Sequence, residues 1–178
     1  MSESDVKPLL WFVFRITVVH CVTYFVMGFI AFTLFDYTYW YSVPPLVYYM
    51  LPTSHPQVAV GPLLNVIRGI IFGLVLYPVR SILFKEKYGW LYMWGLLVGV
   101  GIFSTFGPAP GSVEGMIYTV VPIWLQLAFL PEVLIQALLL SILMYIWQRN
   151  PHDKRIWIPM IILFIIVLSF AILGFIFG

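Results

Sequence analysis

The sequence predicts an all-α polytopic membrane protein with five transmembrane helices and further interfacial or re-entrant segments on its outer face. Of the 178 residues, 62% are apolar and only 9% are charged, and the mean hydropathy is +1.02. Soluble domains contain roughly a quarter charged residues, so this composition excludes an ordinary soluble fold. Disorder and a disulfide-stapled domain are excluded too, because apolar residues dominate and Cys21 is the only cysteine. We expect residues 1–178 to form a single integral membrane domain.

Five apolar runs are predicted to cross the bilayer, because a helix needs about 20 mostly apolar residues to cross roughly 30 Å of hydrocarbon. The fourth run is expected to begin at Pro131, since Leu130-Pro131-Glu132 has the pattern of a helix start. Proline is favoured at the first helical position, and a carboxylate is favoured at the positive end of a helix. The predicted spans cover residues 9–34, 58–84, 89–106, 131–147 and 156–177.

Two further segments, residues 37–56 and 113–130, are expected to be embedded on the outer side without crossing. The first is rich in tyrosine and interrupted by prolines, a composition that suits the lipid headgroup level. The second follows a compact Gly/Pro turn at residues 106–115 and is either a sixth span or a re-entrant or interfacial helix. The placement of the basic residues decides between these two alternatives.

Lysine and arginine accumulate in short cytoplasmic loops. With five spans, one side of the membrane receives all the loop cations and the other side receives none. A sixth span would move the last three cations to the opposite side and remove this asymmetry. We therefore expect five spans in the plasma membrane, with the N-terminus cytoplasmic and the C-terminus outside. The cations on the cytoplasmic side are Lys7, Arg80, Lys85, Lys87, Arg149, Lys154 and Arg155.

Arg68 is the most informative polar residue, because it lies about ten residues inside the second predicted span. An arginine at a helix centre costs about 2.5 to 3.5 kcal/mol on insertion scales, so it should face the bundle interior with a partner. Asn65 shares its helical face. Glu114 and Glu132 are the candidate carboxylate partners, and Gln136 lies one turn beyond Glu132.

Two interpretations of these polar residues remain open. In one, Arg68, Asn65, Glu114, Glu132 and Gln136 form an outward-facing pocket for a polar or anionic small molecule or a lipid headgroup. In the other, Arg68 and a carboxylate form a purely structural ion pair between the second and fourth spans. The sequence does not choose which of the two acids pairs with Arg68.

His20 and Tyr24, one helical turn apart in the first span, form a weaker candidate for a proton relay. His55 and His152 fall on opposite sides of the membrane in this topology, so we expect no metal site and no haem. A histidine hydrogen-bonded between helices is the simpler interpretation of His20.

Two pairs of glycines spaced four residues apart, Gly69 with Gly73 and Gly95 with Gly99, favour close helix packing. They would pack the second and third spans together or against a partner chain. The net charge of +2 is too small and too scattered to indicate a nucleic-acid partner or a polybasic lipid patch.

The sequence favours a transport or ligand-binding component with a polar site around Arg68. One alternative is a non-catalytic accessory subunit of a larger membrane complex, because the last span has no charged residue and offers an apolar surface for docking. Another is an intramembrane lipid-modifying enzyme, which would require Ser112 or Glu114 to be reactive. We assign no catalytic residue and no cofactor. The chain is small, so we expect a homo-oligomer or a partner membrane subunit within the lipid bilayer.

Overall fold

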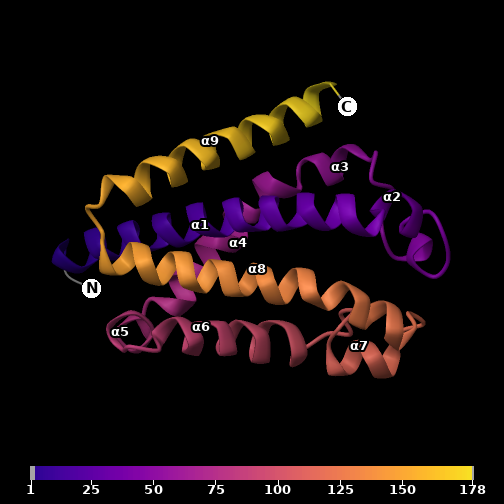
Figure 1. The fold of residues 1–178 in the computed structure, drawn as a ribbon, viewed down its shortest axis with the longest axis horizontal. Helices are drawn as coiled ribbons and strands as arrows, with labels where there is room; N and C mark the ends of the chain where they lie inside the picture. The colour runs from indigo at the N-terminus through magenta and orange to yellow at the C-terminus, as the bar shows by residue number, and fades with distance from the viewer. Residues whose placement is uncertain (1–2, 178) are drawn as a thin grey trace.

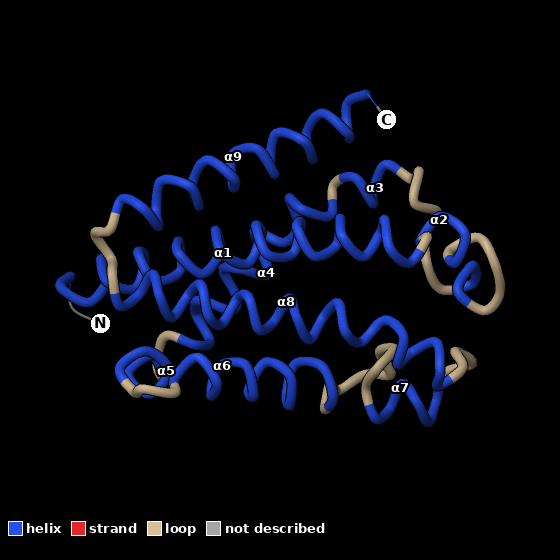
Figure 2. The backbone as a smooth tube through the Cα atoms, in the orientation of Figure 1, coloured by secondary structure: helices blue, strands red, loops and turns tan. Residues whose placement is uncertain are grey.

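The computed structural model describes residues 3–177, and the side chains of residues 6–176. This part of the chain is built of helices and connecting loops, without strands (Figures 1 and 2). Among the described residues, three helices are long and apolar enough to cross a membrane. They are α1 (Glu3–Phe35), α8 (Ile123–Arg149) and α9 (Lys154–Phe177). The expected all-helical class is confirmed for this part of the chain.

The other elements are shorter and irregular. The predicted second span is divided into three helices, α3, α4 and α5, and the predicted third span ends in a π-helical turn, η2. The bounds are α2 (Tyr37–Trp40), η1 (Leu46–Tyr48), α3 (Pro56–Ala59), α4 (Gly61–Leu76), α5 (Arg80–Lys85), α6 (Gly89–Val98), η2 (Gly99–Phe103) and α7 (Val113–Tyr118).

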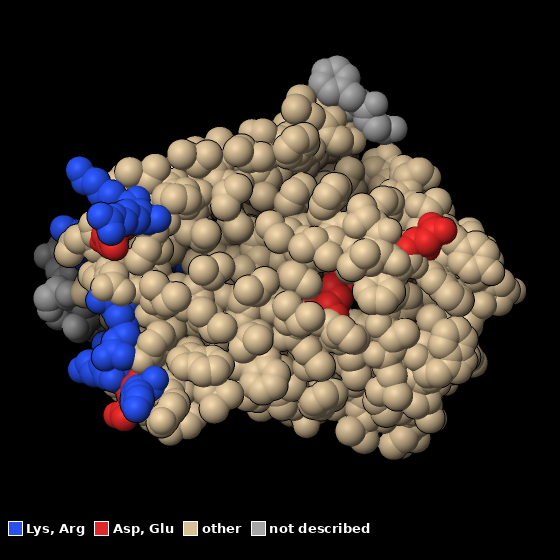
Figure 3. All heavy atoms as spheres, in the orientation of Figure 1, with Lys and Arg blue, Asp and Glu red and all other residues tan. Residues whose placement is uncertain are grey.

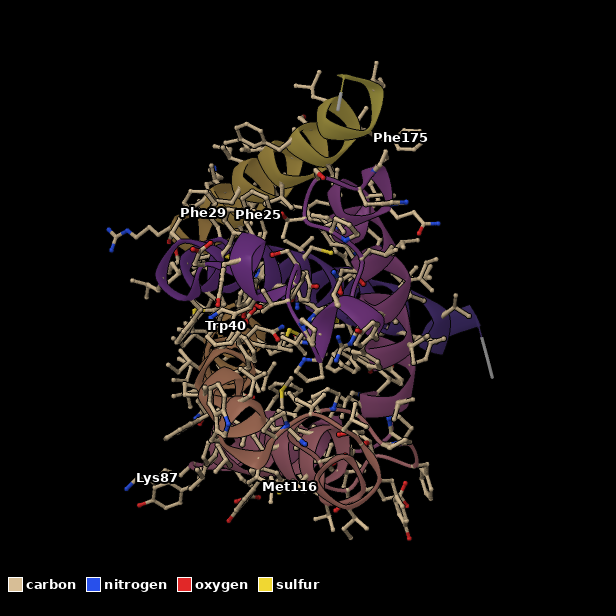
Figure 4. The ribbon with its side chains drawn as sticks, turned by 90° about the vertical axis from the view of Figure 1, so that its right-hand side faces the viewer. Phe25, Phe29, Trp40, Lys87, Met116 and Phe175 are labelled. Carbon is tan, nitrogen blue, oxygen red and sulfur yellow. The ribbon has the colours of Figure 1, made fainter. Side chains whose placement is uncertain are left out.

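Helix α1 is the centre of the bundle. It packs against α4, α8 and α9, while α6 packs against α8 on the side away from α9 (Figure 1). Seen from the end opposite the start of α1, Phe25 lies on the side of α1 that faces α9 (Figure 4). Its ring stacks with that of Phe170 at a centroid distance of 6.3 Å. Arg68 and Asn65 on α4, and Glu132 and Gln136 on α8, therefore lie on helices that pack against α1.

Two predicted spans are interrupted where the sequence weakens a helix. Helix α4 ends at Leu76, just before Pro78, which lacks the N–H that would continue the ladder. Helix α6 gives way to η2 at Gly99, and Gly101 follows within the turn. Glycine disfavours a regular helix by about 1 kcal/mol relative to alanine, which favours a wider turn here.

The expectation that a helix starts at Pro131 is wrong. Helix α8 begins at Ile123 and runs through Pro131, and Pro8 and Pro159 likewise lie inside α1 and α9. A proline inside a helix removes one hydrogen bond. Breaking the helix in an apolar run would expose several more backbone groups that lipid cannot satisfy, so the continuous helix is preferred.

The predicted segment 113–130 is consequently not one element. It comprises the short helix α7, a turn, and the first two turns of α8. The predicted segment 37–56 is irregular as expected, with only α2 and η1 as regular structure. Both segments lie at the end of the molecule away from the start of α1 (Figure 1).

The first glycine pair packs α4 against α1 and not against α6. A Cβ added at Gly69 would lie 2.6 Å from the Cα of Thr17, and one at Gly73 would lie 2.7 Å from the Cα of Val13. The second pair, Gly95 and Gly99, would place its Cβ atoms in open space. The two pairs therefore do not meet each other, and α6 finds its partner in α8.

Candidate functional site

His20 joins three helices at the centre of the bundle. Its side chain is fully buried, with Nε2 3.2 Å from Oδ1 of Asn65 on α4 and Nδ1 3.4 Å from Nε2 of Gln136 on α8. An amide oxygen accepts and an amide nitrogen donates, so these contacts fit the neutral tautomer protonated at Nε2. The Nδ2 of Asn65 also donates to the carbonyl oxygen of Gly61 at 3.0 Å.

A cavity of about 110 Å³ lies beside His20 and extends between α4 and η2. Arg68, His20 and Gln136 supply its polar groups. Its walls are otherwise apolar, and they include Phe72, whose ring centroid lies 5.4 Å from the Arg68 guanidinium carbon. The space suits a few water molecules or one small polar molecule.

The sequence predicted that Arg68 faces the bundle interior. In the structure Arg68 lies at the edge of the bundle instead. Its side chain is exposed on α4 while it lines the cavity, so the cavity opens to the surroundings next to the guanidinium. Within the described residues, no Asp or Glu forms a salt bridge with Arg68. The predicted structural ion pair is therefore not formed with either acid.

The two acids lie elsewhere for separate reasons. The carboxylate of Glu132 accepts a hydrogen bond from the Tyr37 hydroxyl. It also packs toward α1, since a Cβ at Gly28 would lie 3.9 Å from its Oε1. Glu114 is exposed in the first turn of α7, at the end of the molecule. The structure thus brings together Arg68, Asn65, Gln136 and His20, and separates them from Glu114.

Tyr37 and Tyr41 form an aromatic pair beside Glu132, with their rings stacked at a centroid distance of 5.1 Å. Burial, the hydrogen bond to Glu132 and its negative charge raise the pKa of Tyr37 above its ordinary value. Burial and the negative charge of Glu132 raise the pKa of Tyr41 to about 12. Both phenols therefore stay protonated at neutral pH, and that of Tyr37 donates to Glu132. A cavity of about 160 Å³ adjoins this group.

Glu132 and Gln136 lie one turn apart on the same face of α8. Polar groups therefore follow one line through the bundle, from Tyr37 and Glu132 to Gln136 and His20. Tyr24, the predicted relay partner of His20, has its ring centroid 6.1 Å from that of the imidazole. Both imidazole nitrogens contact amides instead.

Sequence reasoning missed Tyr37 as the partner of Glu132, because 95 residues separate the two. Nothing in the sequence distinguishes Tyr37 from the other tyrosines of its segment. Sequence reasoning also gave Phe72 no role, although a ring one turn from Arg68 on an apolar helix was a usable signal.

Ser112 and Gln126 hold the Gly/Pro turn together. Ser112 is fully buried, and its Oγ accepts from the amide of Gly115 at 2.9 Å and donates to the carbonyl oxygen of Ala109 at 2.7 Å. Gln126 accepts from the amide of Gly111 at 2.9 Å. Ser112 is thus the N-cap of α7. A buried hydroxyl engaged on both sides is poorly placed to act as a nucleophile.

In the cavity, the chain offers one guanidinium, one amide and one imidazole for recognition. Guanidinium binds carboxylates with two parallel hydrogen bonds, which gives this group a preference for oxyanions. Among the described residues, no three His, Cys, Asp or Glu side chains converge as metal ligands. The chain matches no known family model, no curated protein and no solved structure with significance.

Proposed function

We propose that the protein is an integral membrane transport or ligand-binding component that takes a short monocarboxylate into the cavity beside Arg68. The observation that carries the proposal is that Arg68, His20 and Gln136 line one cavity that extends from the edge of an apolar bundle to its buried histidine. A mid-helix arginine costs about 2.5 to 3.5 kcal/mol on insertion scales, and a bound anion offsets this cost.

The chemistry of the cavity favours a monoanion with a short hydrocarbon portion. Arg68 is the single Lys or Arg among the described lining residues, and the two ring nitrogens of His20 contact neutral amides. One negative charge therefore balances the site. Phe72, Leu97 and Ile102 supply apolar walls that suit a few methyl or methylene groups.

This function requires a defined topology, for which we retain five spans. Helix α4 has 16 residues and is about 24 Å long at 1.5 Å per residue, and α3 and α5 extend it at both ends. The start of α1 and the end of α9 lie at opposite ends of the bundle, as an odd number of crossings requires (Figure 1). Arg68 then lies near the middle of the bilayer.

The basic residues supply the proposed orientation. On the face drawn in Figure 3, lysines and arginines gather at the end where α1 starts, and no blue side chain is visible at the other end. Basic loops favour the cytoplasmic side. We therefore place the N-terminus in the cytoplasm, the C-terminus outside, and the α2 and α7 segments on the outer face of the plasma membrane.

Thermal stabilisation tests the proposed ligand class. The purified protein is heated in detergent with acetate, bicarbonate, phosphate or sulfate at matched ionic strength. A ligand at 100 times its Kd stabilises the folded state by about 2.7 kcal/mol. We expect acetate to raise the Tm of the wild type and of Arg80→Gln, a control that removes a cation outside the cavity, and not of Arg68→Gln. Equal Tm shifts in all three proteins would contradict the proposal.

An accessory subunit is the second candidate, and the exposure of α9 favours it. In its most apolar stretch, α9 has only 11% of its residues buried within the chain, against 44% for α1. An apolar helix that covers little of its own chain has surface available for another membrane subunit or a second copy. Native mass spectrometry after mild extraction separates these cases, because a foreign subunit in fixed stoichiometry would favour the accessory role.

A further inference from the structure

A second, larger cavity lies at the basic end of the bundle, away from the site of Arg68. It is a groove of about 1250 Å³ between the first turns of α1, the end of α8 and the start of α9. Three tryptophans line it: Trp147 is buried and forms the floor, while Trp11 and Trp157 are exposed on its sides. We refer to this cavity as the tryptophan groove.

Cations surround this apolar surface. Lys7, Arg15, His152 and Lys154 belong to the lining, and no Asp or Glu is found among the lining residues whose side chains the structure describes. The guanidinium of Arg15 donates to Oε1 of Gln148 at 2.6 Å, a neutral partner that leaves its positive charge available. Lys7 and Lys154 are exposed at the edge. The tryptophan groove thus combines a hydrocarbon-compatible interior with an anion-attracting margin.

We propose that the tryptophan groove binds an anionic phospholipid of the surrounding bilayer. The phosphate would lie against Lys7, Arg15 and Lys154, and the acyl chains would run along the tryptophans toward Ile161. Basic pockets between membrane helices recognise lipid headgroups in this way, and tryptophan is favoured at the headgroup level. The proposal requires a membrane-embedded chain but is independent of any ligand at Arg68.

A lipid fits these features better than a soluble phosphate. A free phosphate ion would use the cations and leave the apolar walls of the groove facing water, which is unfavourable. The volume also exceeds the roughly 300 to 1,000 Å³ of pockets for drug-sized ligands. The sequence did not predict this patch because α1 and the α8–α9 turn bring together cations that are more than a hundred residues apart.

Native mass spectrometry tests the proposal on the full chain, released from mixed micelles with equimolar phosphatidylglycerol and phosphatidylcholine. We expect phosphatidylglycerol to be retained preferentially. The variant Lys7→Gln/Lys154→Gln should weaken its retention by about 25-fold, because each surface lysine contributes roughly fivefold. The control Lys85→Gln/Lys87→Gln removes the same charge at the same end but outside the groove, so it should retain the lipid like the wild type.

Two further arms complete the test. Lys7→Arg/Lys154→Arg keeps the charge and should retain phosphatidylglycerol, which separates charge from folding. Glycerol phosphate, which has the headgroup chemistry without acyl chains, should not displace the lipid. Equal retention of both lipids, equal losses in the groove and control variants, or displacement by glycerol phosphate would each overturn the proposal.

Discussion

The close approach of α1 and α4 makes a sharp prediction about two glycines that look alike in the sequence. Alanine at Gly69 would place its Cβ 2.6 Å from the Cα of Thr17, whereas alanine at Gly95 would meet nothing within 4 Å. Ordinary contacts of a Cβ begin near 3.4 Å. The obstacle at Gly69 is backbone, so α4 must move away from α1 to accommodate one methyl group.

The two substitutions should change the free energy of unfolding in opposite directions. In a helix interior, alanine is favoured over glycine by about 1 kcal/mol, so Gly95→Ala should leave stability unchanged or raise it by up to that amount. Gly69→Ala gains the same propensity but overpacks a helix interface, which typically costs about 1 to 3 kcal/mol. Its net effect should be a loss of up to about 2 kcal/mol in the free energy of unfolding, so it should be less stable than Gly95→Ala by about 1 to 3 kcal/mol.

The assay is reversible unfolding in mixed micelles with increasing SDS, followed by far-ultraviolet circular dichroism. Gly73→Ala provides an independent check, because its Cβ would lie 2.7 Å from the Cα of Val13. We expect both α4 variants to unfold at lower SDS fractions than the wild type and Gly95→Ala. If Gly69→Ala is as stable as Gly95→Ala, the described packing of α4 on α1 is refuted.

Three other predictions concern the polar groups. His20→Phe should lower the free energy of unfolding by about 1 to 2 kcal/mol, because the buried amide of Asn65 and the half-buried amide of Gln136 lose their contacts; SDS unfolding measures this, and unchanged stability would argue against the hydrogen bonds. Gln126→Leu leaves the Gly111 amide without its acceptor, so we expect a loss of about 1 to 3 kcal/mol in the same assay, and no loss would contradict its role. The pKa of Tyr41 is raised from 10 to about 12, so its contribution to stability is complete below pH 10 and is lost as the pH rises toward 12. The difference in phenolate absorbance between wild type and Tyr41→Phe should show ionisation near pH 12, and ionisation near pH 10 would be inconsistent with burial.

Apolar runs and their interruptions were readable from the sequence, because each helix must satisfy its own backbone wherever lipid surrounds it. The runs that became α1 and α9 needed no information from other parts of the chain. The prediction that a helix starts at Pro131 failed because local helix-start preferences are small compared with the cost of exposing backbone groups in an apolar run.

The composition of the site was partly predictable, and its pairing was not. Arg68, Asn65 and Gln136 stood out as polar residues in apolar helices, and the structure places them around one histidine. Glu132 was one of the two candidate partners of Arg68, but in the structure its carboxylate contacts Tyr37 and points toward α1. Linear spacing fixes which residues share a face of one helix, and it does not fix which helix that face meets.

The most direct test of the proposed function is the distance between a bound carboxylate and Arg68. Solid-state NMR measures it in lipid bilayers, with isotope-labelled acetate carboxyl carbon and labelled arginine nitrogens. A bidentate contact brings that carbon within about 4 Å of the guanidinium nitrogens. We predict dipolar coupling at that distance in the wild type and in Arg80→Gln, and its loss in Arg68→Gln. No coupling in the wild type, or coupling that survives Arg68→Gln, would contradict an anion site at Arg68.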